Sequence, residues 1–144
     1  MAKADKEKHF VGQIAQKAFI INEKGQVLLV QYPNNDLHVG GKWDLPGGRL
    51  NEGETPLEGL KREVREEIGQ DIEVHGILTT ATVVVNPTFQ LYFVLYKASL
   101  VNLGQPFVAE PDEIANIAWH DKTDVGGLSM LNDNVERALK QFLV

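Results

Sequence analysis

The stretch that most constrains the fold lies between residues 48 and 69, where glycines and glutamates recur at fixed spacing around one predicted helix. Thr55 is suited to cap this helix, because a proline follows it in the first turn and Glu58 occupies the capping-box position. Gly69 fits the left-handed position beyond the last turn. The sequence therefore predicts a helix over residues 56–68, preceded by a tight glycine-containing loop.

Three glutamates of this helix, Glu63, Glu66 and Glu67, lie at helical contact spacing beside an apolar stripe. The stripe consists of Leu57, Leu60, Val64 and Ile68. A helix packed by this stripe holds the carboxylates at the rim of the buried surface, where water and a ligand can reach them. A hard divalent cation best offsets their mutual repulsion, and magnesium prefers carboxylate oxygens and substrate phosphates.

Two other interpretations of the acidic helix are less consistent with the sequence. A zinc site is not indicated, because the chain has no cysteine and its histidines lack zinc-ligand spacing. A solvated acidic face with i,i+4 pairs, such as Glu58 with Arg62, is the usual explanation of a glutamate-rich helix. Here, however, seven positions hold the residues that one fixed pattern requires. Judged from average composition, such a match would arise by chance on the order of once in a million chains of this length.

Residues 47–70, GGRLNEGETPLEGLKREVREEIGQ, resemble the signature of the Nudix hydrolases. That pattern is Gly, five residues, Glu, seven residues, Arg-Glu, an aliphatic, any residue, Glu-Glu, any residue, Gly and an aliphatic. Residues 48–70 match it except at the last position, where Gln70 replaces the aliphatic residue and Ile72 can fill the space. Residues 41–46, GKWDLP, are similar to the MutT-like branch of the family. The resemblance implies an α/β fold, an α/β/α sandwich with a mixed β-sheet between helices.

The resemblance also implies a metal site of magnesium or manganese. Its expected ligands are Glu63, Glu66 and Glu67, with the Gly48 carbonyl oxygen and Glu54 in support. Arg62 neighbours Glu66 on the helix, so its guanidinium can hold a carboxylate bidentately and orient it. A surface role is the alternative for Arg62.

The general base is left open, because family members use either a glutamate of the motif or one on a distant loop. Glu67 and Glu113 are the candidates, and Glu66 is expected to be essential for activity. Glu113 lies in a segment, residues 110–113, that resembles the late acidic loop of the family, and Glu110 is a further candidate. The alternative for Glu113 is a solvated residue at the start of a strand.

Candidate substrate-binding residues fall into three chemical groups, each with a plain structural alternative. Lys42 and Arg49 flank the glycine loop and can contact phosphate, or can simply be exposed basic residues. The aromatic residues Trp43, Phe89 and Trp119 can stack on a base or sugar, but an aromatic residue beside a strand more often belongs to the core. Asn132 and Asp133 stand where MutT-like relatives keep base-contacting residues, and an N-cap explains them equally well.

Length and composition indicate one domain without membrane or nucleic-acid features. A chain of 144 residues with 43% apolar content suits a single domain, expected over residues 9–144 with residues 1–8 as a flexible tail. No membrane span or signal peptide is recognisable, so we expect a cytoplasmic protein. The net charge of −6 counts against nucleic-acid binding and favours a small phosphorylated ligand drawn in by cations. The sequence leaves open whether the protein forms a homodimer.

Hydrophobic patterning predicts the remaining elements. Residues 13–21 and 26–32 are expected to form a hairpin, residues 72–85 and 89–101 two long strands, and residues 114–120 a short strand. Alternating apolar residues on both sides of residues 89–101 predict that helices cover both faces of the sheet. A last amphipathic helix is expected over residues 132–142, with Val135, Ala138, Leu139 and Phe142 on its apolar side.

The family resemblance implies hydrolysis of a nucleoside diphosphate linked to another group. The compact length and residues 41–48 favour a nucleoside triphosphate pyrophosphohydrolase that releases a monophosphate and pyrophosphate. Pro87, which follows the end of the motif, resembles a marker of ADP-ribose pyrophosphatases, so ADP-ribose or another nucleotide sugar is the alternative substrate. The alternative for Pro87 is a purely structural role in the turn after residues 85–86. A nucleotide-sensing module without turnover is a second alternative, which the full set of glutamates disfavours.

Overall fold

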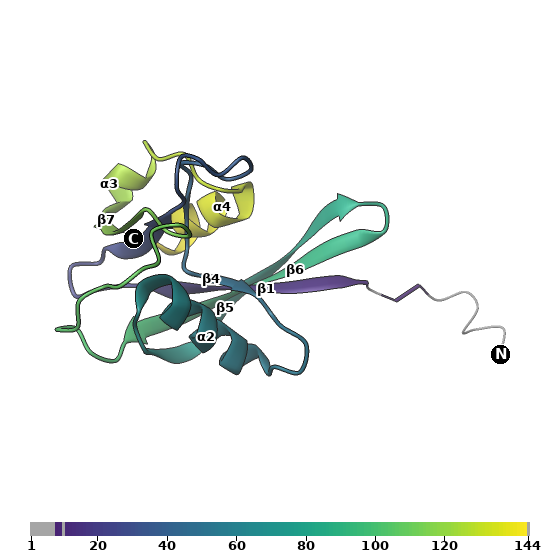
Figure 1. Cartoon of the computed structure of the whole chain (residues 1–144), viewed down its shortest axis with the longest axis horizontal. Helices are drawn as coiled ribbons and strands as arrows, with labels where there is room; N and C mark the ends of the chain where they lie inside the picture. The colour runs from purple at the N-terminus through teal and green to yellow at the C-terminus, as the bar shows by residue number, and fades with distance from the viewer. Residues whose placement is uncertain (1–7, 10, 144) are drawn as a thin grey trace.

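The computed structural model describes residues 8–9 and 11–143, so most of the predicted N-terminal tail lies outside the described residues. Its strands form two sheets, and its helices lie outside them (Figure 1). The strands are β1 (Gly12–Ile20), β2 (Val27–Gln31), β3 (Trp43–Asp44), β4 (Gly47–Arg49), β5 (Ile72–Asn86), β6 (Phe89–Leu100) and β7 (Asn116–His120). The helices are α2 (Pro56–Ile68), α3 (Lys122–Val125) and α4 (Asp133–Phe142). None of the helices in residues 8–9 and 11–143 is long and apolar enough to cross a membrane.

The larger sheet is mixed, as expected. Its strand order is β4-β1-β6-β5, with β1 parallel to β6 and the other pairs antiparallel. The smaller sheet has the order β3-β2-β7 and is antiparallel.

The predicted hairpin of residues 13–21 and 26–32 is wrong beyond its turn. The turn forms, and Ile21 makes one antiparallel bridge with Val27. The two strands then diverge into different sheets, β1 beside β4 and β6, and β2 between β3 and β7. Local turn chemistry fixes the reversal, but longer-range pairings decide where each strand goes.

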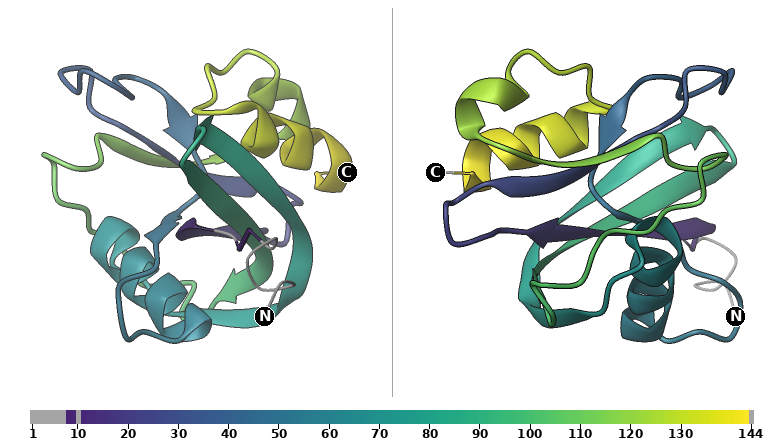
Figure 2. Two further views of the ribbon diagram at one scale, coloured as in Figure 1. Left: turned by 90° about the vertical axis from the view of Figure 1, so that its right-hand side faces the viewer. Right: turned by 60° about the vertical axis from the view of Figure 1, so that its left-hand side comes forward.

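Helices α2 and α4 cover opposite faces of the larger sheet (Figure 2), as predicted. Val94 and Tyr96 of β6 belong to the core under α2, whereas Phe93 and Leu95 belong to the core under α4. Strand residues alternate between faces, so β6 is buried on both sides. The α2 core includes Leu60, Val64 and Ile68, and the α4 core includes Val135, Ala138 and Leu139.

Helix α2 has the predicted bounds because its ends carry strong local signals. The Thr55 side chain accepts a hydrogen bond from the Glu58 N–H, and the Glu58 carboxylate accepts one from the Thr55 N–H. Gly69 ends the helix with a φ of 66°. Gln70 does not occupy an aliphatic slot, since its amide donates to the carbonyl oxygens of Gln105 and Pro106, while Ile72 packs in the core.

Strand β4 is a thin edge made largely of glycine. It pairs with β1, and Gly47 has a φ of 138° and lies so close to the Gln16 carbonyl that a Cβ would collide with it. Without side chains at Gly47 and Gly48, residues of α2 can reach past the edge of the sheet.

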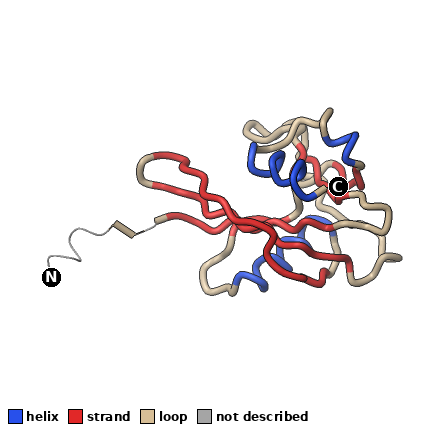
Figure 3. The backbone as a smooth tube through the Cα atoms, turned by 180° about the vertical axis from the view of Figure 1, so that it is seen from behind, coloured by secondary structure: helices blue, strands red, loops and turns tan. Residues whose placement is uncertain are grey.

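The β5–β6 pair extends beyond the body as a long arm (Figure 3). It follows the predicted strands to within a residue at each end. Val84 and Val85 near its tip are exposed.

Candidate active site

A cleft of about 710 Å³ opens between the larger sheet and α4, and two glutamates of α2 reach it past strand β4. Glu63 and Glu67 line one part of it, together with Gly48. The start of α4 lines another part through Asn132 and Asp133. Val83, Leu91, Phe93 and Leu131 contribute apolar surface. Three of the predicted metal ligands, Gly48, Glu63 and Glu67, therefore share one cavity with the predicted base-contacting residues Asn132 and Asp133.

Arg62 binds three carboxylates at once. Its Nε and Nη2 donate to the two oxygens of Glu54 at 2.6 and 2.9 Å, and its Nη1 donates to Glu63 at 3.0 Å and Glu66 at 3.1 Å. The hydrogen bond to Glu54 is the main reason why the pKa of Arg62 lies above its ordinary value. The bidentate partner is thus Glu54 and not Glu66, but the predicted contact with Glu66 is present.

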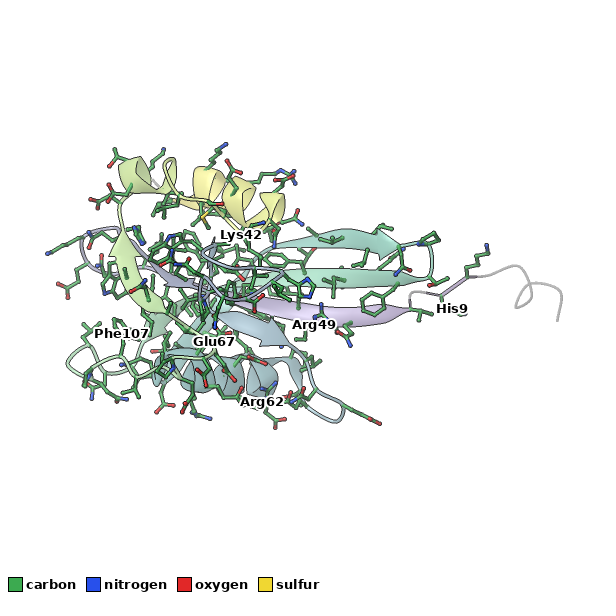
Figure 4. The ribbon with its side chains drawn as sticks, turned by 45° about the horizontal axis from the view of Figure 1, so that its top comes forward. His9, Lys42, Arg49, Arg62, Glu67 and Phe107 are labelled. Carbon is green, nitrogen blue, oxygen red and sulfur yellow. The ribbon has the colours of Figure 1, made fainter. Side chains whose placement is uncertain are left out.

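Glu67 is the buried member of the acidic group, with only 8% of its surface exposed (Figure 4). Burial raises its pKa to about 8; Lys17 opposes the rise, and Asp44 and Glu63 add to it. The Oε2 atom of Glu67 is buried and has no hydrogen-bond partner among the described residues. An unpaired buried oxygen is costly, so this atom is suited to receive a ligand.

A buried network that the sequence analysis missed lies beside Glu67. Lys17 Nζ donates to Asp44 Oδ2 at 2.7 Å and to the Gly47 carbonyl oxygen at 3.3 Å, and the Tyr32 hydroxyl donates to the same Asp44 oxygen at 2.8 Å. Burial works to lower the pKa of Lys17, but Asp44, Tyr32 and Glu67 together raise it. Lys17 is therefore charged at neutral pH. The available signal was a lysine directly before the buried apolar residues 18–20 of the first strand.

Glu66 and Glu113 lie outside the cleft and share a shallower depression. This depression, of about 300 Å³, is lined by both glutamates and by Glu110. The side chain of Glu66 is 53% exposed. The structure therefore brings the predicted late acidic loop next to Glu66 and not next to Glu67.

Of the predicted basic and aromatic residues, only Arg49 lines the cleft. Lys42 lies in the loop before β3, outside the cleft lining, and Trp43 packs edge-on against His120 with ring centroids 4.6 Å apart. Trp119 packs against Phe107 in the region of a separate pocket. Phe89 is half-buried near the tip of the β5–β6 arm. Asn132 lines the cleft and also caps α4, by accepting a hydrogen bond from the Val135 N–H.

The donor set suits a hard divalent cation. All of the predicted ligand atoms are oxygens, and the buried, unpaired Glu67 Oε2 provides an oxygen that needs a partner. The absence of a side chain at Gly48 gives the Glu63 carboxylate its place, since a Cβ there would lie 2.5 Å from Glu63 Cδ. Within the described part of the chain, however, no three acidic or histidine side chains are already gathered as a metal site, and Arg62 holds Glu54, Glu63 and Glu66 instead.

Known proteins resemble this chain in both sequence and fold. The 8-oxo-dGTP diphosphatase of Proteus vulgaris is 41% identical over 61 residues, which cover 42% of this chain and 54% of that protein. The chain thus matches about half the length of that relative. Nucleoside triphosphatase NudI of Enterobacter sp. (strain 638) is 27% identical over 119 residues, covering 77% of this chain and 84% of the relative.

Among solved structures, the MutT protein from Methanosarcina mazei Go1 has a TM-score of 0.73 at 26% identity, covering 94% of this chain and 98% of that one. The family model of the NUDIX domain matches residues 13–142. Nudix hydrolases generally use divalent metal cations. Because the match spans nearly the whole chain and includes every residue of the acidic motif, the protein belongs to the Nudix family.

Proposed function

We propose that this protein hydrolyses a nucleoside triphosphate to a nucleoside monophosphate and pyrophosphate, in the manner of MutT. The observation that carries the proposal is the shared cleft, which joins Glu63 and Glu67 of α2 to Asn132 and Asp133 of α4. With the phosphate chain of the nucleotide bound near Glu63 and Glu67, its base would lie at the start of α4, beside Asn132 and Asp133. The names of the Proteus and Enterobacter relatives, a diphosphatase and a nucleoside triphosphatase, support this class of substrate.

Magnesium or manganese is part of the proposal. Glu63, Glu66 and Glu67 would hold the cation, with the Gly48 carbonyl oxygen and Glu54 in support. When bound, it supplies charge neutralisation at the phosphoanhydride and makes water more acidic. Arg62 would orient the carboxylates of Glu63 and Glu66, because its guanidinium donates a hydrogen bond to each of them.

Glu67 is our preferred general base. It lines the cleft, and its Oε2 atom is buried without a hydrogen-bond partner among the described residues, so this oxygen is available to accept a proton. It would accept a proton from the attacking water, whose oxygen bonds to phosphorus as the anhydride P–O bond breaks. Glu113 remains the alternative, acting from the depression that it shares with Glu66.

Arg49, Asn132 and Asp133 are the proposed substrate contacts, because all three line the cleft. Arg49 is exposed on the edge strand β4 and is suited to a phosphate oxygen. The side chains at the start of α4 offer donors and acceptors to the edge of a base. The proposal does not use Lys42 or Trp43, since neither lines the cleft.

A substrate panel tests the proposal. Purified protein is assayed with magnesium and with manganese against nucleoside triphosphates, oxidised purine triphosphates, ADP-ribose, dinucleoside polyphosphates and sugar nucleotides. We expect a triphosphate to give the highest kcat/KM, with monophosphate and pyrophosphate as products. Preference for ADP-ribose or a sugar nucleotide would establish the alternative substrate class instead. Binding without turnover of any compound would indicate a nucleotide sensor.

Two further parts of the proposal concern the whole protein. A cytoplasmic location follows from a free nucleotide as substrate, and imaging of the tagged protein tests it. We also propose that the protein forms a homodimer, and sedimentation equilibrium tests this. A monomer at micromolar concentration would remove that part without affecting the proposed reaction.

A further inference from the structure

Lys17 is a buried cation in the wall of the cleft, and the proposed reaction gives it no role. The residue is 7% exposed and lines the cavity together with Glu67. Among the described residues that line this cleft, Lys17 and Arg49 have cationic side chains, whereas Glu63, Glu67 and Asp133 have carboxyl groups. An anionic substrate therefore enters a cavity whose own side chains do not attract it, so each cation in the wall matters.

The ammonium group of Lys17 has donor capacity left. It carries three N–H donors, and the hydrogen bonds found within the described residues use two, one to Asp44 and one to the Gly47 carbonyl oxygen. These two bonds hold the nitrogen in place, and Tyr32 fixes Asp44 in turn. A charged donor held in this way, away from bulk water, binds an anionic oxygen strongly.

The ion pair is not well explained as a stability device. Burying a lysine and an aspartate costs desolvation energy, and apolar residues of similar size are often as stable or more stable in such positions. Lys17 of this pair also lies at the cavity wall, on the same face of β1 as Ala15, which lines the cleft too. Its position is that of a ligand-binding group.

We propose that Lys17 contacts the phosphate chain of the bound nucleotide, donating its third N–H to an anionic oxygen on the part of the cleft that Glu67 lines. Asp44 and Tyr32 position it for this contact. The inference rests on the proposed function, because it requires a phosphate-bearing substrate in this cleft. It adds a substrate-binding residue outside the acidic motif.

The variants must separate this contact from the effect of an unpaired buried charge. Lys17→Met alone leaves Asp44 buried without its cation and can fail to fold, so the main variant is the double change Lys17→Met with Asp44→Asn. Asp44→Asn alone keeps the ammonium. Lys97→Met removes an exposed lysine of the same sheet and is the matched control. Urea unfolding confirms that each variant is folded.

The measurement compares two ligands, with and without phosphates. A deoxyguanosine triphosphate analogue with a methylene bridge between the α and β phosphorus atoms is titrated calorimetrically in the presence of magnesium, and deoxyguanosine is titrated by NMR. We expect the double variant to bind the analogue on the order of tenfold to a hundredfold more weakly, as for loss of a charged hydrogen bond, and the nucleoside unchanged. Lys97→Met should bind the analogue within about threefold of the wild type. Asp44→Asn keeps the ammonium but removes the carboxylate that positions it, so its affinity should lie between those of the wild type and the double variant.

Three results would overturn the Lys17 contact. They are equal weakening for both ligands, unchanged affinity for the analogue, and failure of the wild type to bind the analogue. Failure of the proposed function is a separate result, namely that the wild type turns over no compound of the panel. A wild type that binds the analogue through Lys17 without hydrolysing any triphosphate would retain the contact and remove the reaction.

Discussion

At the scale of single residues, the neighbours Glu66 and Glu67 show how one helical turn places two identical side chains in different surroundings. Glu66 is exposed and bonds to Arg62, while Glu67 is buried and has one oxygen without a partner. Burial makes the proton affinity of Glu67 much higher than that of a solvated glutamate. The two residues therefore lend themselves to separate experimental tests.

Replacing Glu67 with Gln is expected to lower activity and to remove a pH dependence of stability. In the folded protein the pKa of Glu67 is about 8, against 4.5 for an ordinary glutamate. Between these values the folded state holds a proton that the unfolded chain has lost, so the free energy of unfolding falls as pH rises from about 4.5 to about 8. Glu67→Gln should flatten this decline in EDTA, raise the thermal midpoint at pH 8, and reduce kcat by ~100-fold or more.

The measurement is a series of thermal unfolding curves in chelator from pH 5 to pH 9. Glu73→Gln, at an exposed position on β5, is the matched control and should behave like the wild type. An equal decline with pH in Glu67→Gln and wild type would show that Glu67 is not the group responsible.

At the scale of elements, the glycine edge β4 decides whether α2 can present its carboxylates to the cleft. Gly47 meets the backbone of β1, whereas Gly48 meets only the end of the Glu63 side chain. The same substitution should therefore have different consequences at the two adjacent positions. One glycine is required by the backbone and the other by the site.

Gly47→Ala is expected to destabilise the protein by ~3 kcal/mol or more, because its φ is positive and the new Cβ would collide with the Gln16 carbonyl. Gly48→Ala should cost less than ~1 kcal/mol, since the flexible Glu63 carboxylate can move aside. It should nevertheless weaken magnesium binding by ~10-fold or more, because Glu63 would leave its position.

Urea unfolding measures the first effect and calorimetric titration of magnesium the second. Gly104→Ala is the control, because its Cβ would make only an ordinary contact of 3.6 Å with Asn102. Wild-type magnesium affinity in Gly48→Ala would contradict the role given to the Gly48–Glu63 contact.

At the scale of the whole molecule, the cleft is bounded by residues from opposite layers of the sandwich. Glu63 and Glu67 come from the helix on one face of the larger sheet, and Asn132 and Asp133 come from the start of the helix on the other. A nucleotide that spans the cleft links these layers through contacts at both ends. Binding should therefore stabilise the entire fold and not one helix alone.

Magnesium together with the non-hydrolysable triphosphate analogue is expected to raise the thermal midpoint more than either alone. A ligand at 100 times its Kd stabilises the folded state by about 2.7 kcal/mol, which corresponds to roughly 5–10 °C for a domain of this size. Differential scanning calorimetry with EDTA as the control measures the shift. An equal shift from the analogue in EDTA would contradict a binding site shared by cation and phosphate.

The sequence by itself determined the elements whose signals are local. The bounds of α2 follow from Thr55, Glu58 and Gly69, which act within a few residues of the helix ends. The long strands β5 and β6 and the apolar side of α4 follow from hydrophobic periodicity. The acidic motif identified the family because its spacing is fixed by one helix and one loop.

Only the tertiary structure decided which residues meet across the chain. It separated β1 and β2 into two sheets, buried Glu67 but exposed Glu66, and paired Lys17 with Asp44 from a different strand. In the structure Lys42 and Trp43, which were predicted to bind substrate, do not line the cleft, whereas Lys17, which was not predicted, does. These outcomes depend on burial and on pairings between distant segments of the chain. Helix capping and hydrophobic periodicity act between neighbouring residues, so the sequence pattern predicted the local elements but not these long-range contacts.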